Sequence, residues 1–260
     1  MGLVYTRFRR IDALDRIIDT GEPWEIEGQA FLRHLLVNFV GNGSGALFRR
    51  EALVGIGGFD AGLRAAGLEG TEDYLAQLLV ARSWTIGVVP EYLTGYRFLP
   101  VAMSANRGRM WRSRLAMVNL VRRRCPGAPE DVLDTAEAAV RAELALHCLL
   151  GERAPHSAFE TMNRALSLAP RATLAVGWHA LCRRLRAISK RRLGIERPQP
   201  NATPFLCMDP KTGPEQMRRH PLDPWITAYA LREADVRVGP KDRRETGRKR
   251  SPDTLLPHMI

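Results

Sequence analysis

The sequence predicts an α/β protein that continues into a small α-helical extension, and three observations support this assignment. Short runs of β-branched and aromatic residues alternate with helix-like segments over residues 1–124. Three longer helical patterns follow within residues 125–194, and Pro, Gly and charged residues dominate residues 195–260. We therefore expect an α/β region over 1–124, a helical extension over 125–194, and a basic, largely flexible tail over 195–260.

The first region contains the segments expected to build a sheet. Strand-like content marks residues 3–8, 12–19, 46–48, 85–89 and 93–98. Apolar residues at helical spacing mark residues 31–39, 49–54, 71–81 and 107–124. Thr71 precedes the third of these helices, at the place where a hydroxyl side chain is typical of an N-cap. Three glycines within residues 41–45 indicate a loop between a helix and a strand.

Positive charge is concentrated towards the C-terminus. The formal net charge is +11, and residues 181–250 carry 18 Lys and Arg against 8 Asp and Glu. No aromatic residues interleave the basic residues at 241–250, so no nucleic-acid partner is expected. Within the tail, only residues 225–234 have a helical pattern.

The last helix of the extension, over residues 174–193, combines an apolar stripe with a cationic face, and Gly194 is expected to end it. The stripe consists of Leu174, Trp178, Leu181, Leu185 and Ile188. We expect this stripe to pack on the rest of the domain, because packing is the commoner use of an amphipathic helix. The alternative is that the helix lies on an anionic membrane surface.

Cysteine usage and hydropathy narrow the class of protein. The four cysteines include no C-x-x-C pair, so neither a zinc site nor a disulfide framework is expected. The first ten residues lack the apolar core of a signal peptide, and no apolar run is long enough to span a bilayer. These features predict a cytoplasmic protein, and the basic helix adds the inner face of the membrane as a peripheral location.

An ordered series of short motifs lies between residues 38 and 104. The series is Asn38 to Gly45, Arg49 to Leu53, Gly57-Gly58-Phe59-Asp60, Glu69-Gly70-Thr71-Glu72-Asp73-Tyr74, Val89-Pro90-Glu91, Tyr96-Arg97 and Met103-Ser104. The carboxylate pair Glu72-Asp73 opens a helix, where the helix dipole stabilises negative charge, and Gly70 lets a substrate approach closely. The glycine-rich loop at 41–45 offers backbone N–H groups to a phosphate or a hydroxyl.

This series resembles the acceptor half of the family-two glycosyltransferases, which have the GT-A fold. The resemblance implies a partial GT-A (Rossmann-like) sheet and an inverting sugar transfer from a nucleotide-sugar donor to a glycan or lipid-linked acceptor, as in the synthesis of cell-envelope polysaccharides. It assigns Asp73 as the general base that deprotonates the acceptor hydroxyl, and it assigns Glu72 to the acceptor pocket. The residues that it implies for substrate binding are Asn42, Gly43, Ser44, Gly45 and Arg97.

Each of these assignments has an ordinary structural alternative. Glu72 and Asp73 also suit a helix start whose carboxylates only complement the dipole. The loop at 41–45 also suits a tight connection between helix and strand. Arg97 suits a salt bridge with a nearby carboxylate as well as a contact with a diphosphate.

The metal site of many GT-A enzymes is missing from this sequence. No Asp-x-Asp occurs, and the position where the resemblance expects a late histidine holds Leu99, which cannot ligate a metal. The six histidines are scattered without metal-ligand spacing. A divalent cation, Mg²⁺ or Mn²⁺, is therefore expected only in a complete enzyme that has further ligands.

The resemblance covers only the acceptor half, so we expect the donor-binding half to precede this sequence or to come from a separate chain. Without that half, the sheet is expected to expose an edge and the chain to be unstable alone. Two alternatives to sugar transfer stay open. One is a truncated relative that binds a glycan or a partner without turnover, and the other is a membrane-surface module that uses the helix at 174–193.

Overall fold

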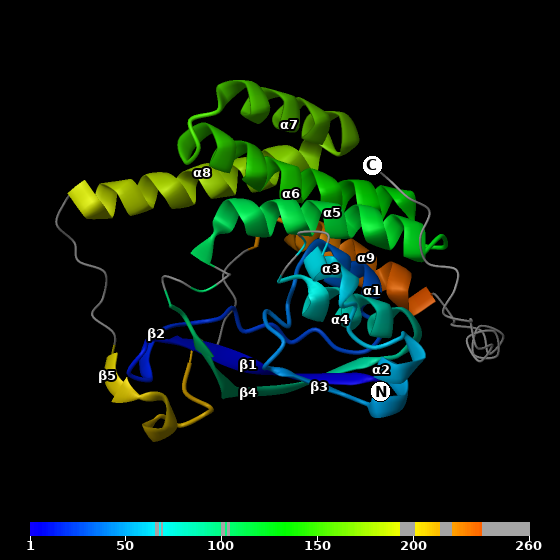
Figure 1. Ribbon diagram of the computed structural model, residues 1–260, viewed down its shortest axis with the longest axis vertical. Helices are drawn as coiled ribbons and strands as arrows, with labels where there is room; N and C mark the ends of the chain where they lie inside the picture. The colour runs from blue at the N-terminus through cyan, green and yellow to red at the C-terminus, as the bar shows by residue number, and fades with distance from the viewer. Residues whose placement is uncertain are drawn as a thin grey trace.

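A mixed sheet of five strands lies at the base of the part of the chain that the structure describes, and helices cover one of its faces (Figure 1). The computed structural model describes residues 1–65, 68, 70–99, 102, 105–192, 201–213 and 220–235. The α/β class predicted from the sequence is confirmed.

Strand β1 (Leu3–Ile11) is the central strand, because it has partners along both edges. One edge pairs in parallel with β4 (Ile86–Arg97). The other edge is shared by two antiparallel strands, β3 (Ala46–Phe48) at the start of β1 and β2 (Arg16–Thr20) at its end. Strand β5 (Asn201–Pro204) continues the sheet beyond β2.

Strand β4 is continuous where the sequence predicts two separate strands. Its register with β1 shifts between Thr6 and Phe8, so that Pro90 and Glu91 have no partner residue on β1. This bulge explains how a proline, which lacks a backbone N–H, is accommodated within the strand.

The outer edge of β4 is covered at two points by other segments of the same chain. Ile86 and Gly28 exchange both backbone hydrogen bonds, at 2.8 and 2.9 Å. Tyr92 donates its N–H to the carbonyl of Pro210 at 2.8 Å. The expectation of a fully exposed edge is therefore wrong for these positions, because backbone groups that a neighbouring strand would use are already paired.

The main hydrophobic core lies between the sheet and the helices nearest to it. Helices α1 (Phe31–Leu36), α4 (Glu72–Ser83) and α9 (Asp223–Asp235) belong to this layer, and two short helices, α2 (Arg50–Gly55) and α3 (Gly62–Ala65), follow β3. Buried members of the core include Leu3, Tyr5, Leu35, Leu75, Leu78 and Ile86.

Four longer helices form a second layer above the first (Figure 1). They are α5 (Arg107–Arg124), α6 (Glu130–Leu150), α7 (Pro155–Leu168) and α8 (Pro170–Arg192). Helix α6 packs against each of the other three, and α1 packs against its inner side. Arg122 fastens α5 to α6, because its guanidinium binds the carboxylates of Glu130, Asp134 and Glu137 at 2.6 to 3.1 Å.

The apolar stripe of α8 does not pack on the domain, so that expectation is wrong. Four of its five members, Leu174, Trp178, Leu185 and Ile188, are exposed, and Leu181 is half-buried. The buried side of α8 consists of small or β-branched residues, Ala172, Thr173, Val176 and Ala180. Gly194, which was expected to end this helix, lies outside the described residues.

Two segments of the expected flexible tail are ordered parts of the fold. The first contains β5, which pairs with β2, and the short 3₁₀ helix η2 (Phe205–Cys207). The second is α9, which includes the residues 225–234 that the sequence predicts to be helical. Glu233 of α9 accepts hydrogen bonds from the backbone N–H groups of Leu32 and Arg33, so it occupies the N-terminus of α1. The rest of the predicted tail lies outside the described residues.

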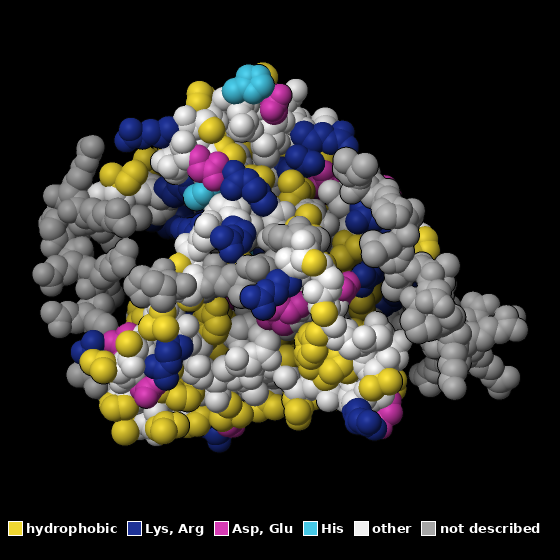
Figure 2. Space-filling view, viewed as in Figure 1, with side chains coloured by type: hydrophobic (Ala, Val, Ile, Leu, Met, Phe, Trp, Pro, Cys, Tyr) yellow, Lys and Arg dark blue, Asp and Glu magenta, His cyan; other side chains and the backbone are white. Residues whose placement is uncertain are grey.

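The helices drawn in Figure 1 lie above the sheet, and hydrophobic side chains line the lower margin of the molecule in Figure 2, where the strands lie in the same view. Leu47 of β3 and Leu93 of β4 are among the exposed apolar residues. A doubly wound α/β fold has helices on both faces of its sheet, so the finer GT-A assignment stays a prediction. None of the described helices has the length and apolar character needed to cross a bilayer.

Candidate functional site

Asp73 lies in the first turn of α4, directly after Glu72. Thr71 occupies the N-cap position as predicted, but its hydroxyl donates to the carbonyl of Leu68 at 2.8 Å and makes no cap bond. Glu72 turns back instead, and its carboxylate accepts a hydrogen bond from the backbone N–H of Gly70 at 2.8 Å. Gly70 has a φ of +79°, a left-handed conformation that favours glycine, so the turn into α4 depends on this residue.

The glycine-rich loop lies against Asp73. A Cβ atom built on Gly43 would lie 3.1 Å from both Cβ and Oδ2 of Asp73, so only glycine fits here without displacing the carboxylate. The structure therefore brings together two motifs that are about thirty residues apart in the sequence.

Hydrogen bonds within the loop hold this position. The side chain of Asn42 accepts from the backbone N–H of Gly45 at 2.8 Å, and that of Asn38 accepts from Gly41 at 2.9 Å. Gly45 in turn accepts from the N–H of Thr6, where β1 has passed beyond β3 and not yet reached β2. The loop thus fills the interruption in this edge of the sheet.

The predicted substrate-binding residues of the loop have different surroundings. Asn42 is buried and uses its oxygen inside the loop, while its amide nitrogen has no hydrogen-bond partner among the described residues. Ser44 is exposed. Asn42 therefore stabilises the loop through one atom and leaves a donor free, and Ser44 is accessible to solvent.

The carboxyl group of Asp73 is partly buried, and this burial raises its pKa above the usual aspartate range. The negative charge of Glu72 raises the pKa further, whereas hydrogen bonds from the backbone N–H groups of Tyr74 and Gly43 oppose the increase. A carboxylate whose pKa is raised by burial beside another carboxylate is a physical marker of acid–base chemistry.

Two adjoining cavities lie between the end of α1, the start of α4 and the second helical layer. The smaller has a volume of about 230 Å³ and the larger about 830 Å³. They share three lining residues, Asn38, Trp111 and Arg114. Gly70, Thr71 and Tyr74 line the smaller cavity, so it opens beside the turn that carries Asp73, although Asp73 itself is not part of its lining.

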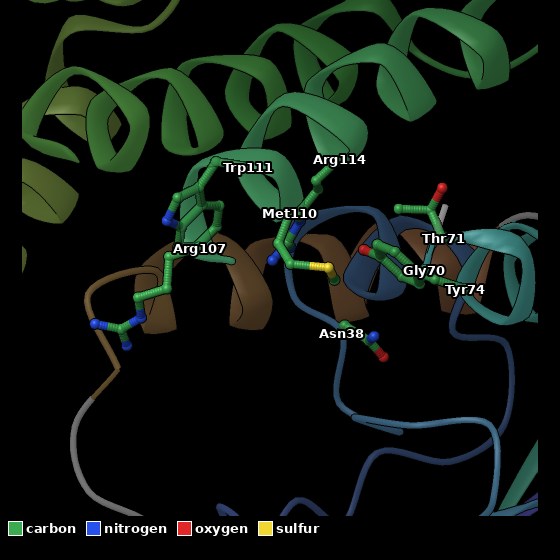
Figure 3. Close-up of a pocket in the computed structure, with 8 residues that line it drawn as sticks. All are labelled: Asn38, Gly70, Thr71, Tyr74, Arg107, Met110, Trp111 and Arg114. Atoms are coloured by element: carbon green, nitrogen blue, oxygen red, sulfur yellow. The ribbon is translucent and has the colours of Figure 1, made fainter. Parts of the chain in front are cut away.

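Arg114 is the residue that connects the two cavities. Figure 3 shows Met110 and Arg114 projecting from α5 towards Asn38 and Tyr74. The Arg114 guanidinium donates to the carbonyl of Leu36 at 2.9 Å and lies 5.4 Å from the ring centroid of Tyr74. Its Nε is buried without a hydrogen-bond partner in the described part of the chain. No role for Arg114 is predicted from the sequence, because an arginine within a basic helix gives no local signal.

The larger cavity combines aromatic and charged side chains. Trp24 and Trp111 contribute aromatic surface, and Arg183, Arg186, His179, His220, Glu22 and Glu143 contribute polar groups. Arg183 is already bound to both oxygens of Glu143, at 2.8 and 2.9 Å. Burial lowers the pKa of His220 to about 4, so its ring is neutral at physiological pH.

Arg97 does not join this site. Its guanidinium binds the carbonyl of Asp12 at 2.8 Å and the carboxylate of Asp15, in the turn between β1 and β2. Thr94 of β4 lies beside Gly45 of the loop. Arg97 follows three residues later on the same strand, and three strand residues span about 10 Å, so Arg97 lies away from the loop. The salt-bridge alternative therefore describes Arg97 in this structure.

The described residues contain no group of three or more His, Cys, Asp or Glu side chains that could hold a metal ion. The four cysteines are free thiols.

Comparisons with protein-family models, with curated proteins and with solved structures gave no significant match to this chain.

Proposed function

We propose that this chain forms the acceptor side of a nucleotide-sugar-dependent glycosyltransferase with a partial GT-A sheet, and that Asp73 is its general base. The observation that carries the proposal is the partly buried Asp73 carboxylate, which has a raised pKa and lies against Gly43 at the start of α4. The motif order around Asp73 supports the same reading, because the resemblance assigns the base to this position.

The reaction needs one proton acceptor on the protein. The oxygen of an acceptor hydroxyl forms a bond to the anomeric carbon of the donor, and the bond from that carbon to the nucleoside diphosphate breaks. The diphosphate leaves with the electron pair, and Asp73 takes the hydroxyl proton. A raised pKa makes the Asp73 carboxylate a stronger base than an ordinary aspartate.

The two adjoining cavities are the proposed acceptor site. Their shared wall contains Trp111, whose ring offers an apolar face to a sugar, and Arg114, whose unpartnered Nε offers a donor. The volumes of the two cavities suit an acceptor with more than one ring, and the hydroxyl to be glycosylated would lie nearest Thr71.

A divalent metal does not fit the residues present. The sequence has no Asp-x-Asp, and no metal-ligand cluster occurs within the described ranges. Leu99 offers no ligand atom. We therefore derive no catalytic step from a metal on this chain.

The first experiment measures sugar transfer from a panel of nucleoside-diphosphate sugars, with the 260-residue chain alone and with the chain expressed together with any coding region upstream of it. In the form that is active, Asp73→Asn is expected to lower kcat by about 10²-fold or more, because it removes the proton acceptor with little change in shape. Glu160→Gln on α7 is the matched control, since that carboxylate is exposed and distant in the helical layer.

The pH profile separates a base from a structural carboxylate. Because the charge of Glu72 is one cause of the raised pKa of Asp73, Glu72→Gln is expected to move the acidic limb of kcat/KM to lower pH. Unchanged transfer in folded Asp73→Asn would exclude the base assignment. A folded protein that neither transfers a sugar nor binds any nucleotide sugar in either form would exclude the enzyme.

A glycan-binding module without turnover is the second candidate function. The observation that favours it is the larger cavity, whose lining includes Trp24 and Trp111 but not Asp73. This candidate predicts that glycans quench tryptophan fluorescence, that Trp111→Ala abolishes the quenching, and that Asp73→Asn leaves it unchanged.

A further inference from the structure

Helix α8 exposes a continuous apolar stripe. Leu174, Trp178, Leu185 and Ile188 are 64%, 70%, 52% and 46% exposed. Their spacing along the chain, four, seven and three residues, places them on one side of the helix. Single exposed apolar residues are common on protein surfaces, but a row that includes a largely exposed tryptophan marks an interaction surface.

The orientation of α8 is fixed by its opposite side. Ala172, Val176 and Ala180 are buried against the rest of the protein. The guanidinium of Arg183 binds the carboxylate of Glu143 on α6. Arg184 donates to the carbonyl of Leu146 at the end of the same helix. These contacts turn the large apolar side chains outwards, so their exposure follows from how the helix is held.

The charge of α8 identifies the kind of partner. Between Pro170 and Arg192 the helix contains seven Arg and Lys residues and no Asp or Glu. Arg171 and Arg186 are exposed, and neither forms an ion pair within the described part of the chain. An apolar stripe with tryptophan on a purely cationic helix is typical of helices that lie in the headgroup region of an anionic bilayer.

The position of α8 is compatible with contact to a flat surface. Figure 1 shows that its C-terminal end extends beyond α6 and α7. A bilayer could therefore contact this end without colliding with the neighbouring helices drawn there. Since none of the described helices can cross a bilayer, the contact would be peripheral.

We propose that α8 docks the protein on an anionic lipid surface, with Leu174, Trp178, Leu185 and Ile188 among the lipid headgroups and Arg171 and Arg186 against lipid phosphates. This docking does not depend on sugar transfer. A protein without transferase activity would bind the same surface, so the two proposals can fail separately.

The test is flotation of the full chain with vesicles of phosphatidylcholine alone and of phosphatidylcholine with about one third phosphatidylglycerol. We expect binding to the anionic vesicles only. The double variant Trp178→Ser, Leu185→Ser is expected to bind at least about tenfold more weakly, because it removes apolar insertion. Leu206→Ser is the matched control, since Leu206 is 91% exposed on η2 and lies outside α8.

A second pair of variants tests the electrostatic contribution. Arg171→Gln with Arg186→Gln is expected to weaken binding, and added salt is expected to weaken it in the unmodified chain, because surface charge is screened. Thermal unfolding of each variant checks that the fold is kept; these side chains are exposed, so little change is expected.

Three results would overturn the proposal. The first is equal vesicle binding by the folded stripe variant and the unmodified chain. The second is equal binding to the neutral and the anionic vesicles. The third is a dimer in solution that Trp178→Ser converts to a monomer while no vesicle binding is found, because a second copy of the chain would then cover the stripe.

Discussion

Helices α6 and α8 lie side by side and are similar in length, yet they bury opposite kinds of surface. Fourteen of the 21 residues of α6 are buried, including its leucines and valines from Val132 to Leu146. Helix α8 buries alanine, threonine and valine and exposes leucine, isoleucine and tryptophan. The charge differs as well, because α6 begins with Glu130 and Asp131 whereas α8 contains no acidic residue.

The difference shows what helical periodicity can and cannot predict. The spacing of Leu174, Trp178 and Leu185 correctly indicates that they share one side of a helix. It does not indicate which side faces the protein, because that depends on neighbours supplied by other elements. Helix α6 has neighbours on several sides, and α8 has α6 and α7 on one.

The largest expected effect tests the comparison directly with one substitution in each helix. Leu133→Ala on α6 is expected to lower the free energy of unfolding by about 2–5 kcal/mol, because Leu133 is fully buried and its truncation leaves a cavity. Leu174→Ala on α8 is expected to change it by less than about 0.5 kcal/mol. Urea unfolding of both variants measures the two values, and similar losses would mean that α8 is packed in solution.

A smaller effect contrasts buried and exposed histidines of the helical layers. Burial lowers the pKa of His34 on α1 to about 3, so at acidic pH the unfolded chain takes up a proton that the folded chain does not. The contribution of neutral His34 to the free energy of unfolding is therefore present above about pH 6.5 and is lost as the pH falls. The loss is about 2 kcal/mol at pH 5.

The measurement is urea unfolding at pH 7 and pH 5. His34→Gln is expected to remove about that much of the difference between the two pH values, whatever its effect at pH 7. His156→Gln, at an exposed position on α7, is expected to leave the difference unchanged. An unchanged difference in folded His34→Gln would show that His34 is protonated in the native protein.

The smallest effect concerns the ion pair that joins the two helices. Glu143 of α6 is nearly buried, whereas its partner Arg183 of α8 is half-exposed. Glu143→Gln is expected to lower the free energy of unfolding by about 1 kcal/mol, because one charge-assisted bond pair is weakened while the guanidinium keeps access to water. Chemical denaturation checks this value, and a loss above about 3 kcal/mol would indicate a fully desolvated pair.

Much of the fold follows from local sequence. The helices α5 and α6 begin and end where the pattern predicts, because caps, charge and apolar spacing agree over long segments. The continuous β4 does not follow, because Pro90 reads as a strand end and is tolerated only through a bulge opposite β1. Local sequence also does not predict that β5 and α9 are ordered parts of the fold, since both are stabilised by contacts with distant residues.

The candidate site is predictable to a similar degree. Asp73 and Gly43 were both identified by motif, and their proximity is a property of the fold. Arg97 was assigned to substrate by the same motif series, but Asp15 lies close enough to bind it. Trp111 and Arg114 are not predicted as site residues by the sequence, because their position in the wall shared by the two cavities depends on the tertiary structure.

Contacts between the first strands and helices and residues 209–233 have a consequence for the order of folding events during synthesis. Glu233 holds the N-terminus of α1 across 201 residues, and Arg9 of β1 donates to the carbonyls of Asp209 and Thr212 across at least 200. Such contacts are slow to form, because a long loop must close before any of them is gained. The first strand leaves the ribosome long before its last partners exist. Completion of the sheet is therefore expected only after residues 201–212 have been synthesised.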